Sequence, residues 1–467
     1  MKVKRKPKRN RAQAPFTVTA DGQGMTGRAG LALVAQTADR LGLTDALSQA
    51  VGDCRSWRDH DPGKVVRDIV LMLADGGDAL RHMAALDQPE LFGPVASAAT
   101  ANRTIVALAE NELVVEWLAA ARLSAHEHAW ANGGAPPVVA AARRGEQPAE
   151  PLCIDLDATL ITAHSDDKDG AAPTYKRGWG FHPLLGYLDR SDGLGESLGG
   201  MLRSGNAGSN TAADHIDCFE ACLAALPCLP AEVELVVRAD TAGCTHGFLD
   251  YVRQAGVGFS VGFPVTADVR DAIRGTPDDA WVPATRQSGE IREGAAVAEI
   301  TGRLDLSKYP EGSRVIVRRE PLHPGAQLTI ADIDGVRFTA FLTDRPDADL
   351  ALLDVRHREH AHVEDRIRGA KDTGARNLPC DTFERNAVWL QLVMMAQDLL
   401  VHTQTLTLDG KLRTAEPKTL RYQLLHTPAR ISRSGRRLLL RIQHDWPWAK
   451  QLVAAFNRLW ALPAPAS

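Results

Sequence analysis

Residues 152–161 read LCIDLDATLI and residues 233–240 read VELVVRAD. Both stretches are β-like, and each carries an aspartate near its end, Asp157 in the first and Asp240 in the second. Further β-like runs lie at 181–188, 196–202 and 257–263, and helical patterns cover 211–226 and 245–256. The order β-β-β-α-β-α-β predicts a mixed sheet flanked by helices, which is an α/β fold.

The rest of the chain divides around this sheet by composition and periodicity. Residues 133–150 are rich in Gly, Pro and Ala, and residues 265–344 alternate between apolar and polar side chains as strands do. We therefore expect a basic arm at 1–14, a helical domain at 15–132, a linker at 133–150, a first part of the sheet domain at 151–264, an all-β insertion at 265–344, a second part at 345–402 and a C-terminal helical region at 403–467.

Charge and composition narrow the class of protein. The 467 residues carry a net charge of −4, yet residues 1–12 hold seven Lys and Arg and no acid. Such a segment suits either a phosphate-binding arm or a solvated terminus. No run approaches the about 20 apolar residues of a membrane span, and the basic start does not lead into a secretory signal. We expect a cytoplasmic protein with no membrane partner, whose seven cysteines are reduced.

Nucleotide-dependent chemistry is not indicated. The chain contains no GxxxxGK[ST] phosphate-binding loop. The glycines of Gly22-x-Gly24-x-x-Gly27 mimic a dinucleotide-binding fingerprint, but no second strand with an acid at its end follows them. We interpret these glycines as a flexible turn.

Three carboxylates are candidates for a metal site. Asp157 lies in the first strand, Asp240 ends the central apolar strand, and Glu364 lies on a helix beyond the β insertion. Mg²⁺ prefers a few fixed carboxylate oxygens, and two such ions can activate a water and stabilise the leaving oxygen of a phosphodiester. The alternative is that all three are solvated acidic side chains at the ends of strands and helices, without a metal-binding role.

A histidine cluster supports a second kind of metal site. His357, His360 and His362 follow one another closely, and His360 lies one helical turn before Glu364. Two histidines and a carboxylate on one helical face could bind zinc, which would make the protein a zinc-dependent hydrolase built on His357, His360 and Glu364. The spacing is not that of the HExxH motif. Helical faces that carry His and Arg often contact phosphate or solvent and bind no metal.

Several segments together resemble a known family, the DDE-type insertion-sequence transposases of bacteria, in the branch whose RNase H-like core is interrupted by a β-strand insertion. The family pattern is Tyr, two residues, Arg, three residues, Glu, six residues, Lys. Glu364 and Lys371 match it, whereas His357 and His360 stand in the Tyr and Arg places. The other similar segments are 60–79, 91–97, 155–159 with 180–184, 238–240 with Gly243, 378–380 and 386–392.

The resemblance implies a DNA transposase that binds terminal inverted repeats and then cleaves and joins strands. Asp157, Asp240 and Glu364 would be the catalytic residues and would hold two Mg²⁺ ions, with Mn²⁺ as a substitute. Asp155 competes with Asp157 for this role, because both face the same side of the strand. A DNA-binding regulator with an inactive core is the alternative within the same fold.

The resemblance also implies partners and contacts. The substrate would be double-stranded DNA, both transposon ends and target, bound by a homodimer associated with the nucleoid. Trp281 in the β insertion could stack on an unpaired base, although a core or surface tryptophan is the simpler interpretation. The expected DNA-binding residues are Lys371, His360, His357, Arg203, Lys176, Arg177 and Arg103.

Overall fold

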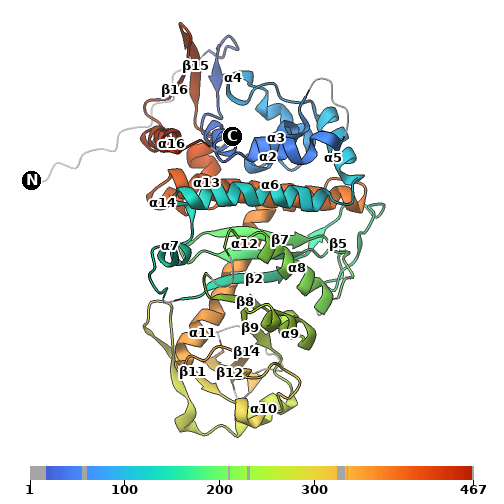
Figure 1. Cartoon of the computed structure of the whole chain (residues 1–467), viewed down its shortest axis with the longest axis vertical. Coiled ribbons are helices and arrows are strands. Elements are labelled where there is room, and N and C mark those ends of the chain that lie inside the picture. The colour runs from blue at the N-terminus through green and yellow to red at the C-terminus, as the bar shows by residue number, and fades with distance from the viewer. Residues whose placement is uncertain are drawn as a thin grey trace, which may run out of the picture.

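The computed structural model describes residues 17–54, 60–148, 150–208, 211–228, 232–322, 332–333 and 335–464. The basic arm expected at residues 1–14 lies outside these ranges. The described chain is elongated, with helices gathered at one end and a large sheet toward the other (Figure 1).

The main sheet has the strand order β10-β11-β12-β14-β9-β8-β2-β6-β7, with β13 paired to β14. At its centre β2 (Leu152–Ala158), β8 (Leu235–Ala239) and β9 (Gly258–Phe263) run parallel to one another. Next to β2, the strands β6 (Leu184–Asp189) and β7 (Gly195–Met201) run antiparallel. The sheet is therefore mixed and flanked by helices, which confirms the α/β prediction.

The segment 265–344 continues this sheet. Strand β14 pairs antiparallel with β9, and β12 and β11 follow it outward, so these strands belong to the central sheet and do not form a sheet of their own. The segment also contains helix α10 (Ala267–Arg274), so the expected all-β composition is wrong in this detail. The strands are β10 (Val282–Thr285), β11 (Ile291–Glu299), β12 (Arg314–Pro321), β13 (Asp332–Ile333) and β14 (Val336–Thr343).

Helix α13 (Phe383–Thr407) joins the sheet to the helical end of the molecule. It packs against β7 on one side and against α1, α3, α5, α6 and α16 on the other, so most of its residues are buried on every face of the helix. No helix in the described ranges combines the length and apolarity needed to cross a bilayer. The helices include α1 (Leu31–Arg40), α2 (Leu43–Val51), α3 (Pro62–Ala74), α4 (Pro89–Phe92), α5 (Ala98–Ala109), α6 (Val114–Ala129), α8 (Ala212–Ala224), α9 (His246–Gln254), α11 (Leu350–Arg358), α12 (His362–Ala370), α14 (Gly410–Arg413), α15 (Pro417–Leu420) and α16 (Ala449–Ala461).

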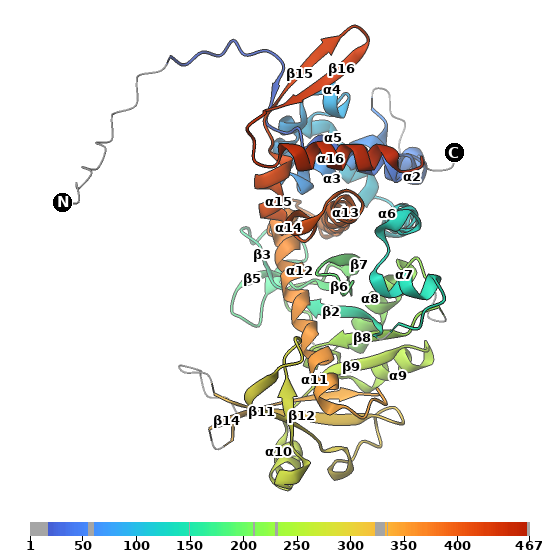
Figure 2. The ribbon, with the colours of Figure 1, turned by 90° about the vertical axis from the view of Figure 1, so that its left-hand side faces the viewer.

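Two expected segments differ in their secondary structure. The linker at 133–150 contains the short helix α7 (Pro137–Arg143). The C-terminal region, expected to be helical, contains a hairpin of β15 (Ala429–Ser434) and β16 (Arg437–Ile442), and β1 (Met25–Thr26) adds to its edge. Figure 2 shows the hairpin projecting from the helical end.

Gly24 is part of the expected glycine turn that precedes β1. Its φ is +66°, and a Cβ there would lie 2.4 Å from the carbonyl oxygen of Ile431 in β15. The close approach of the two backbones accounts for the glycine, which needs no nucleotide to explain it.

A buried charge cluster joins the helical end to the sheet. The carboxylate of Asp398 on α13 accepts a hydrogen bond from the Ser197 amide in β7 at 2.7 Å. The same carboxylate lies 3.0 Å from Arg122 Nε and 3.3 Å from His126 Nε2, both on α6. Burial lowers the pKa of His126, but Asp398 and Glu196 outweigh burial and raise it overall. The protonated form of His126 is therefore favoured in the folded chain.

We expect His126 to make stability depend on pH. Its folded-state pKa lies above the unfolded value of about 6.5, so its contribution is complete below that pH and is lost as pH rises through the folded value. Chemical denaturation of wild type and His126→Gln should show the largest difference in unfolding free energy near pH 6 and a smaller one near pH 9. His128→Gln, on the same helix, is the control. A difference that does not change with pH would contradict the charge-pair account.

Candidate active site

Two of the predicted carboxylates lie side by side at one edge of the sheet. In the parallel pairing of β2 with β8, Leu156 is opposite Ala239, so Asp157 and Asp240 follow at adjacent positions. Asp157 is half-buried and accepts a hydrogen bond from the Ala158 amide at 2.8 Å. Asp240 is exposed and accepts one from the Ala242 amide at 2.9 Å. The ends of parallel strands thus bring together acids that are 83 positions apart in the chain.

Helix α12 brings the third carboxylate to the same edge. The helix packs against β2 and β6, and Glu364 lies in its first turn with an exposed side chain. A cleft of about 740 Å³ is lined by Asp240 and Glu364 together with His357, His360 and aromatic side chains of β9 and β14. Asp157 borders this region without lining the cleft itself.

The electrostatics of Asp157 show that the three acids interact. The pKa of its carboxyl is raised to about 6, mainly by burial and in smaller part by the negative charges of Asp240 and Glu364. His360 and the Ala158 amide act in the opposite direction. A bound cation would relieve this repulsion, because an opposite charge favours the ionised carboxylate.

Asp155 has a different role from Asp157. Its carboxylate is buried and forms a bidentate ion pair with Arg238 of β8, with Nε at 2.7 Å and Nη2 at 2.8 Å. His360 Nδ1 lies 3.0 Å from the same carboxylate. These partners occupy the oxygens of Asp155, so the geometry favours Asp157 as the carboxylate available to a ligand.

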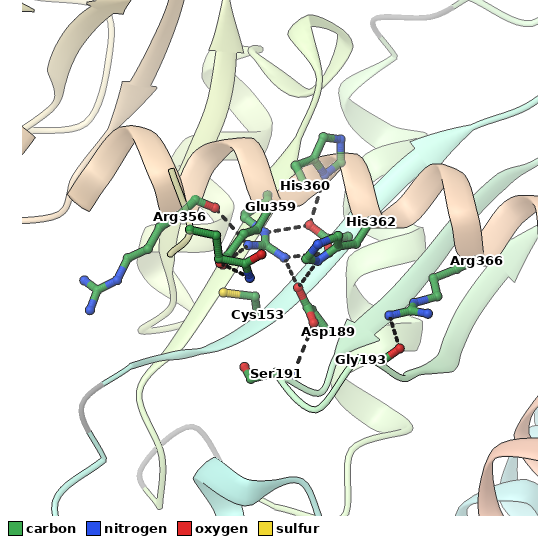
Figure 3. Close-up of polar contacts among 12 residues, drawn as sticks. Cys153, Asp189, Ser191, Gly193, Arg356, Glu359, His360, His362 and Arg366 are labelled. Carbon is green, nitrogen blue, oxygen red and sulfur yellow. Dashed lines mark hydrogen bonds and ion pairs between the residues drawn. The ribbon is translucent and has the colours of Figure 1, made fainter. Parts of the chain in front are cut away.

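Arg238 links the strands to the helix that carries Glu364. Besides Asp155, its guanidinium binds Asp189 at the end of β6 at 2.7 Å and the Arg356 carbonyl oxygen of α11 at 2.9 Å. His362 on α12 lies 3.3 Å from Asp189 (Figure 3). Although burial raises the pKa of Asp189, the bonds from His362 and Arg238 lower it overall. We did not predict this network from the sequence, but an arginine inside an apolar strand was a signal for it, since arginine is almost never fully buried without a partner.

The two histidines expected to contact DNA line the cleft and also have partners within the fold. The ring of His357 stacks on Phe341 at 4.4 Å between centroids, and its Nδ1 lies 3.0 Å from the Ser260 hydroxyl. Burial, with His360 and two arginines nearby, lowers the pKa of His357 well below its usual value. It is therefore a neutral packing residue, and His360 is tied to Asp155.

Lys371 lies close enough to Asp157 and to Lys176 to interact with both charges. Lys371 ends α12 and is half-buried, and burial together with Lys176 lowers the pKa of its ammonium group. The negative charge of Asp157 acts in the opposite direction and raises this pKa. Lys176 and Arg177 are exposed at the tip of a hairpin between β4 (Ala172–Pro173) and β5 (Trp179–Phe181). Lys371 and Lys176 thus form a positive border beside Asp157.

The remaining expected contacts lie elsewhere. Arg203 is buried and binds the His182 carbonyl oxygen at 2.9 Å and Asp214 at 2.9 Å, so it is engaged inside the fold. Arg103 is exposed on α5, in the helical end, where it donates to the Thr100 hydroxyl at 3.0 Å. Trp281 is half-buried between Phe338 and the guanidinium of Arg319, which lies 4.4 Å from its ring centre.

The donor set bears on which metal could bind. Across the described ranges, no three His, Cys, Asp or Glu side chains are grouped closely enough to hold one ion together. Zinc sites need three or four protein ligands on one ion, so the histidine cluster does not fit zinc. Mg²⁺ is commonly held by one or two carboxylates, with waters and substrate phosphates completing its shell.

The chain belongs to the transposase DDE domain group 1 family, whose model matches residues 8–464. Members of this family are transposition enzymes that act on DNA and typically use a divalent cation such as Mg²⁺. No curated protein matches the sequence. The family assignment confirms the resemblance to DDE transposases.

Arg238 should be essential for stability. Arg238→Met leaves Asp155 and Asp189 buried without their cation, which typically costs about 3–5 kcal/mol. Urea denaturation should show this loss of unfolding free energy. Adding Asp155→Asn should restore part of it, because that change removes one buried charge without a partner. An unchanged unfolding free energy in Arg238→Met would show that the network does not hold these elements together.

Proposed function

We propose that the protein is an active DNA transposase that cleaves the ends of an insertion sequence and joins them to target DNA. The observation that carries this proposal is the meeting of Asp157, Asp240 and Glu364 at one edge of the sheet, beside a cleft and a positive border. A regulator without catalytic activity would need no such set of mutually repelling acids.

Asp157, Asp240 and Glu364 would hold a pair of Mg²⁺ ions, because this metal is commonly bound by one or two carboxylates. Asp157 interacts with the charges of both Asp240 and Glu364, which supports a common site. Divalent ions bound there would activate the attacking hydroxyl and stabilise the leaving oxygen. Mn²⁺ should substitute for Mg²⁺.

The residues around the acids hold and orient the DNA. Lys371 is fixed at the end of α12, so it can place a phosphate near Asp157 as a point charge. Lys176 and Arg177, on a short hairpin, extend this contact along the backbone. Arg238 acts through Asp155 and Asp189 by fixing the strands, and is a positioning residue.

The family and the strand order support a finer division of the chain. We assign residues 151–264 and 345–402 to an RNase H-like core, 265–344 to its insertion and 15–132 to binding of the terminal inverted repeats. Cutting two ends of one element requires two active sites, which a homodimer would supply. Such a complex would work on the chromosome, in the nucleoid.

Removing one carboxylate should abolish cleavage. Glu364→Gln keeps the size of the side chain but loses its charge, so cleavage of DNA that flanks the protein's own gene should fall at least about 10³-fold in Mg²⁺ or Mn²⁺. Asp157→Asn and Asp240→Asn should behave alike. DNA binding in Ca²⁺ should remain.

Asp365→Asn is the matched control, because Asp365 is the next residue of α12 and is exposed beside Arg368, at 2.8 Å. It should cleave like wild type. Equal losses in both variants would indicate damage to α12 instead of a catalytic role for Glu364. Binding without cleavage by wild type in every metal would favour an inactive regulator.

Lys371 should contribute through phosphate binding. Lys371→Gln removes one charged hydrogen bond, so kcat/KM for cleavage should fall about 10- to 100-fold. Lys418→Gln is the control, since Lys418 is largely exposed and pairs with Asp372 at 2.9 Å. Initial rates over a range of DNA concentrations would measure both. A loss of the same size in Lys418→Gln would contradict a specific role.

A further inference from the structure

The hairpin β15–β16 is a basic ribbon that the catalytic proposal does not use. It carries Arg430, Arg433, Arg436, Arg437 and Arg441, and no Asp or Glu occurs anywhere between residues 417 and 444. All five arginines are exposed, and within the described part of the chain none of them forms an ion pair. The charge of this ribbon is therefore uncompensated.

The two faces of the ribbon differ. One face carries Ala429, Leu440 and Ile442, which pack toward the core at the hairpin base. The other face carries the cross-strand pairs Arg430–Arg441, Ser432–Leu439 and Ser434–Arg437. Three arginines and two serines thus share one outward surface, which is the pattern of a phosphate-binding surface.

One of these pairs is unfavourable in the isolated protein. Arg430 and Arg441 lie directly opposite each other, and like charges at such positions destabilise a sheet. Arg441 Nε donates to the Ser432 hydroxyl at 3.2 Å, but this neutral acceptor does not compensate the positive charge of the guanidinium. An anionic partner between the two guanidinium groups would turn the repulsion into attraction.

The ribbon is held firmly and stands clear of the fold. At its base the Gln443 amide donates to the Pro428 carbonyl oxygen at 3.1 Å, and Trp446 Nε1 donates to the Gln423 carbonyl oxygen at 3.0 Å. Trp446 packs on Trp448 at 5.6 Å between ring centres. Figure 2 shows the hairpin projecting beside α4 and α16, at the end opposite α10.

We propose that the β15–β16 hairpin enters the major groove of the transposon-end DNA and grips phosphates with Arg430, Arg437 and Arg441. A six-residue strand is about 20 Å long, and residues four apart in it, such as Arg437 and Arg441, are about 13 Å apart. The major groove of B-DNA is about 12 Å wide and admits a two-stranded ribbon. This inference rests on the proposed function, and it assigns end binding to a segment outside the expected helical domain.

The test measures DNA binding in the full chain carrying Asp240→Asn, so that no cleavage intervenes. The probe is a fluorescent duplex from the DNA that flanks the protein's own gene, titrated between 50 and 200 mM salt. Arg430→Gln with Arg441→Gln should weaken binding about 10- to 100-fold at 0.1 M salt and make the slope of log K against log salt about 1.8 less negative.

Two controls separate this effect from others. Arg274→Gln with Arg303→Gln makes the same charge change at exposed positions, at the end of α10 and beside Gly275 that follows it, and should leave affinity and slope nearly unchanged. Without DNA, the hairpin variant should melt at the same temperature as the parent or higher, because a repulsive pair is gone. A clear fall in melting temperature would overturn the account of that pair.

The outcomes distinguish the two proposals. If the parent binds the duplex and the hairpin variant binds equally well, the hairpin inference fails while metal-dependent cleavage can still stand. If the parent binds no duplex, both fail. Equal binding of double-stranded RNA would also overturn the inference, because the major groove of an RNA helix is too narrow and deep for a ribbon.

Discussion

The buried guanidinium of Arg238 is the interaction on which the site depends. It bonds the carboxylates of Asp155 and Asp189 and the carbonyl oxygen of Arg356, and so ties β2, β6 and β8 to α11, just before the helix that carries Glu364. A buried arginine is costly unless nearly all its donors are used, and here they are. The hydrogen bonds of Arg238 therefore hold the strands and the helix in one arrangement. That arrangement sets the relative positions of the acids at the sheet edge.

This network also sorts the acids by function. Asp155 and Asp189 form ion pairs with Arg238, and His360 of η7 (Glu359–Ala361) and His362 of α12 lie within hydrogen-bond distance of them. Among the residues that the structure describes, Asp157 pairs with no arginine, and burial beside Asp240 and Glu364 raises its pKa to about 6. Asp155 and Asp189 bond to Arg238 within the fold, whereas we propose that Asp157, Asp240 and Glu364 hold the cations. Two aspartates separated by one residue in a strand thus have opposite roles.

Much of this could be predicted from the sequence, for physical reasons. The apolar runs that became β2, β8 and β9 are buried strands, and parallel neighbours necessarily end at one edge, so Asp157 and Asp240 had to be near each other. What could not be predicted depends on tertiary contacts. Arginine is usually exposed, but the fold buries Arg203 against Asp214. Likewise the polar side chain of His357 stacks on Phe341.

The hairpin was missed for a related reason. Polar and apolar residues alternate in β15 as in a strand, but so short a run becomes a strand only by pairing with β1 and β16, and we expected a helical region there. The strands of 265–344 were predicted, but their pairing with β9 was not, because register between distant strands depends on the assembled sheet.

The most direct test of the central claim is to locate the metal. Fe²⁺ can replace Mg²⁺, and with ascorbate and peroxide it produces hydroxyl radicals that cut the chain where the ion is bound. We predict cuts close to residues 157, 240 and 364, suppressed by excess Mg²⁺ and absent in Asp157→Asn. Cuts confined to other segments, or cuts near these residues that excess Mg²⁺ leaves unchanged, would contradict the account.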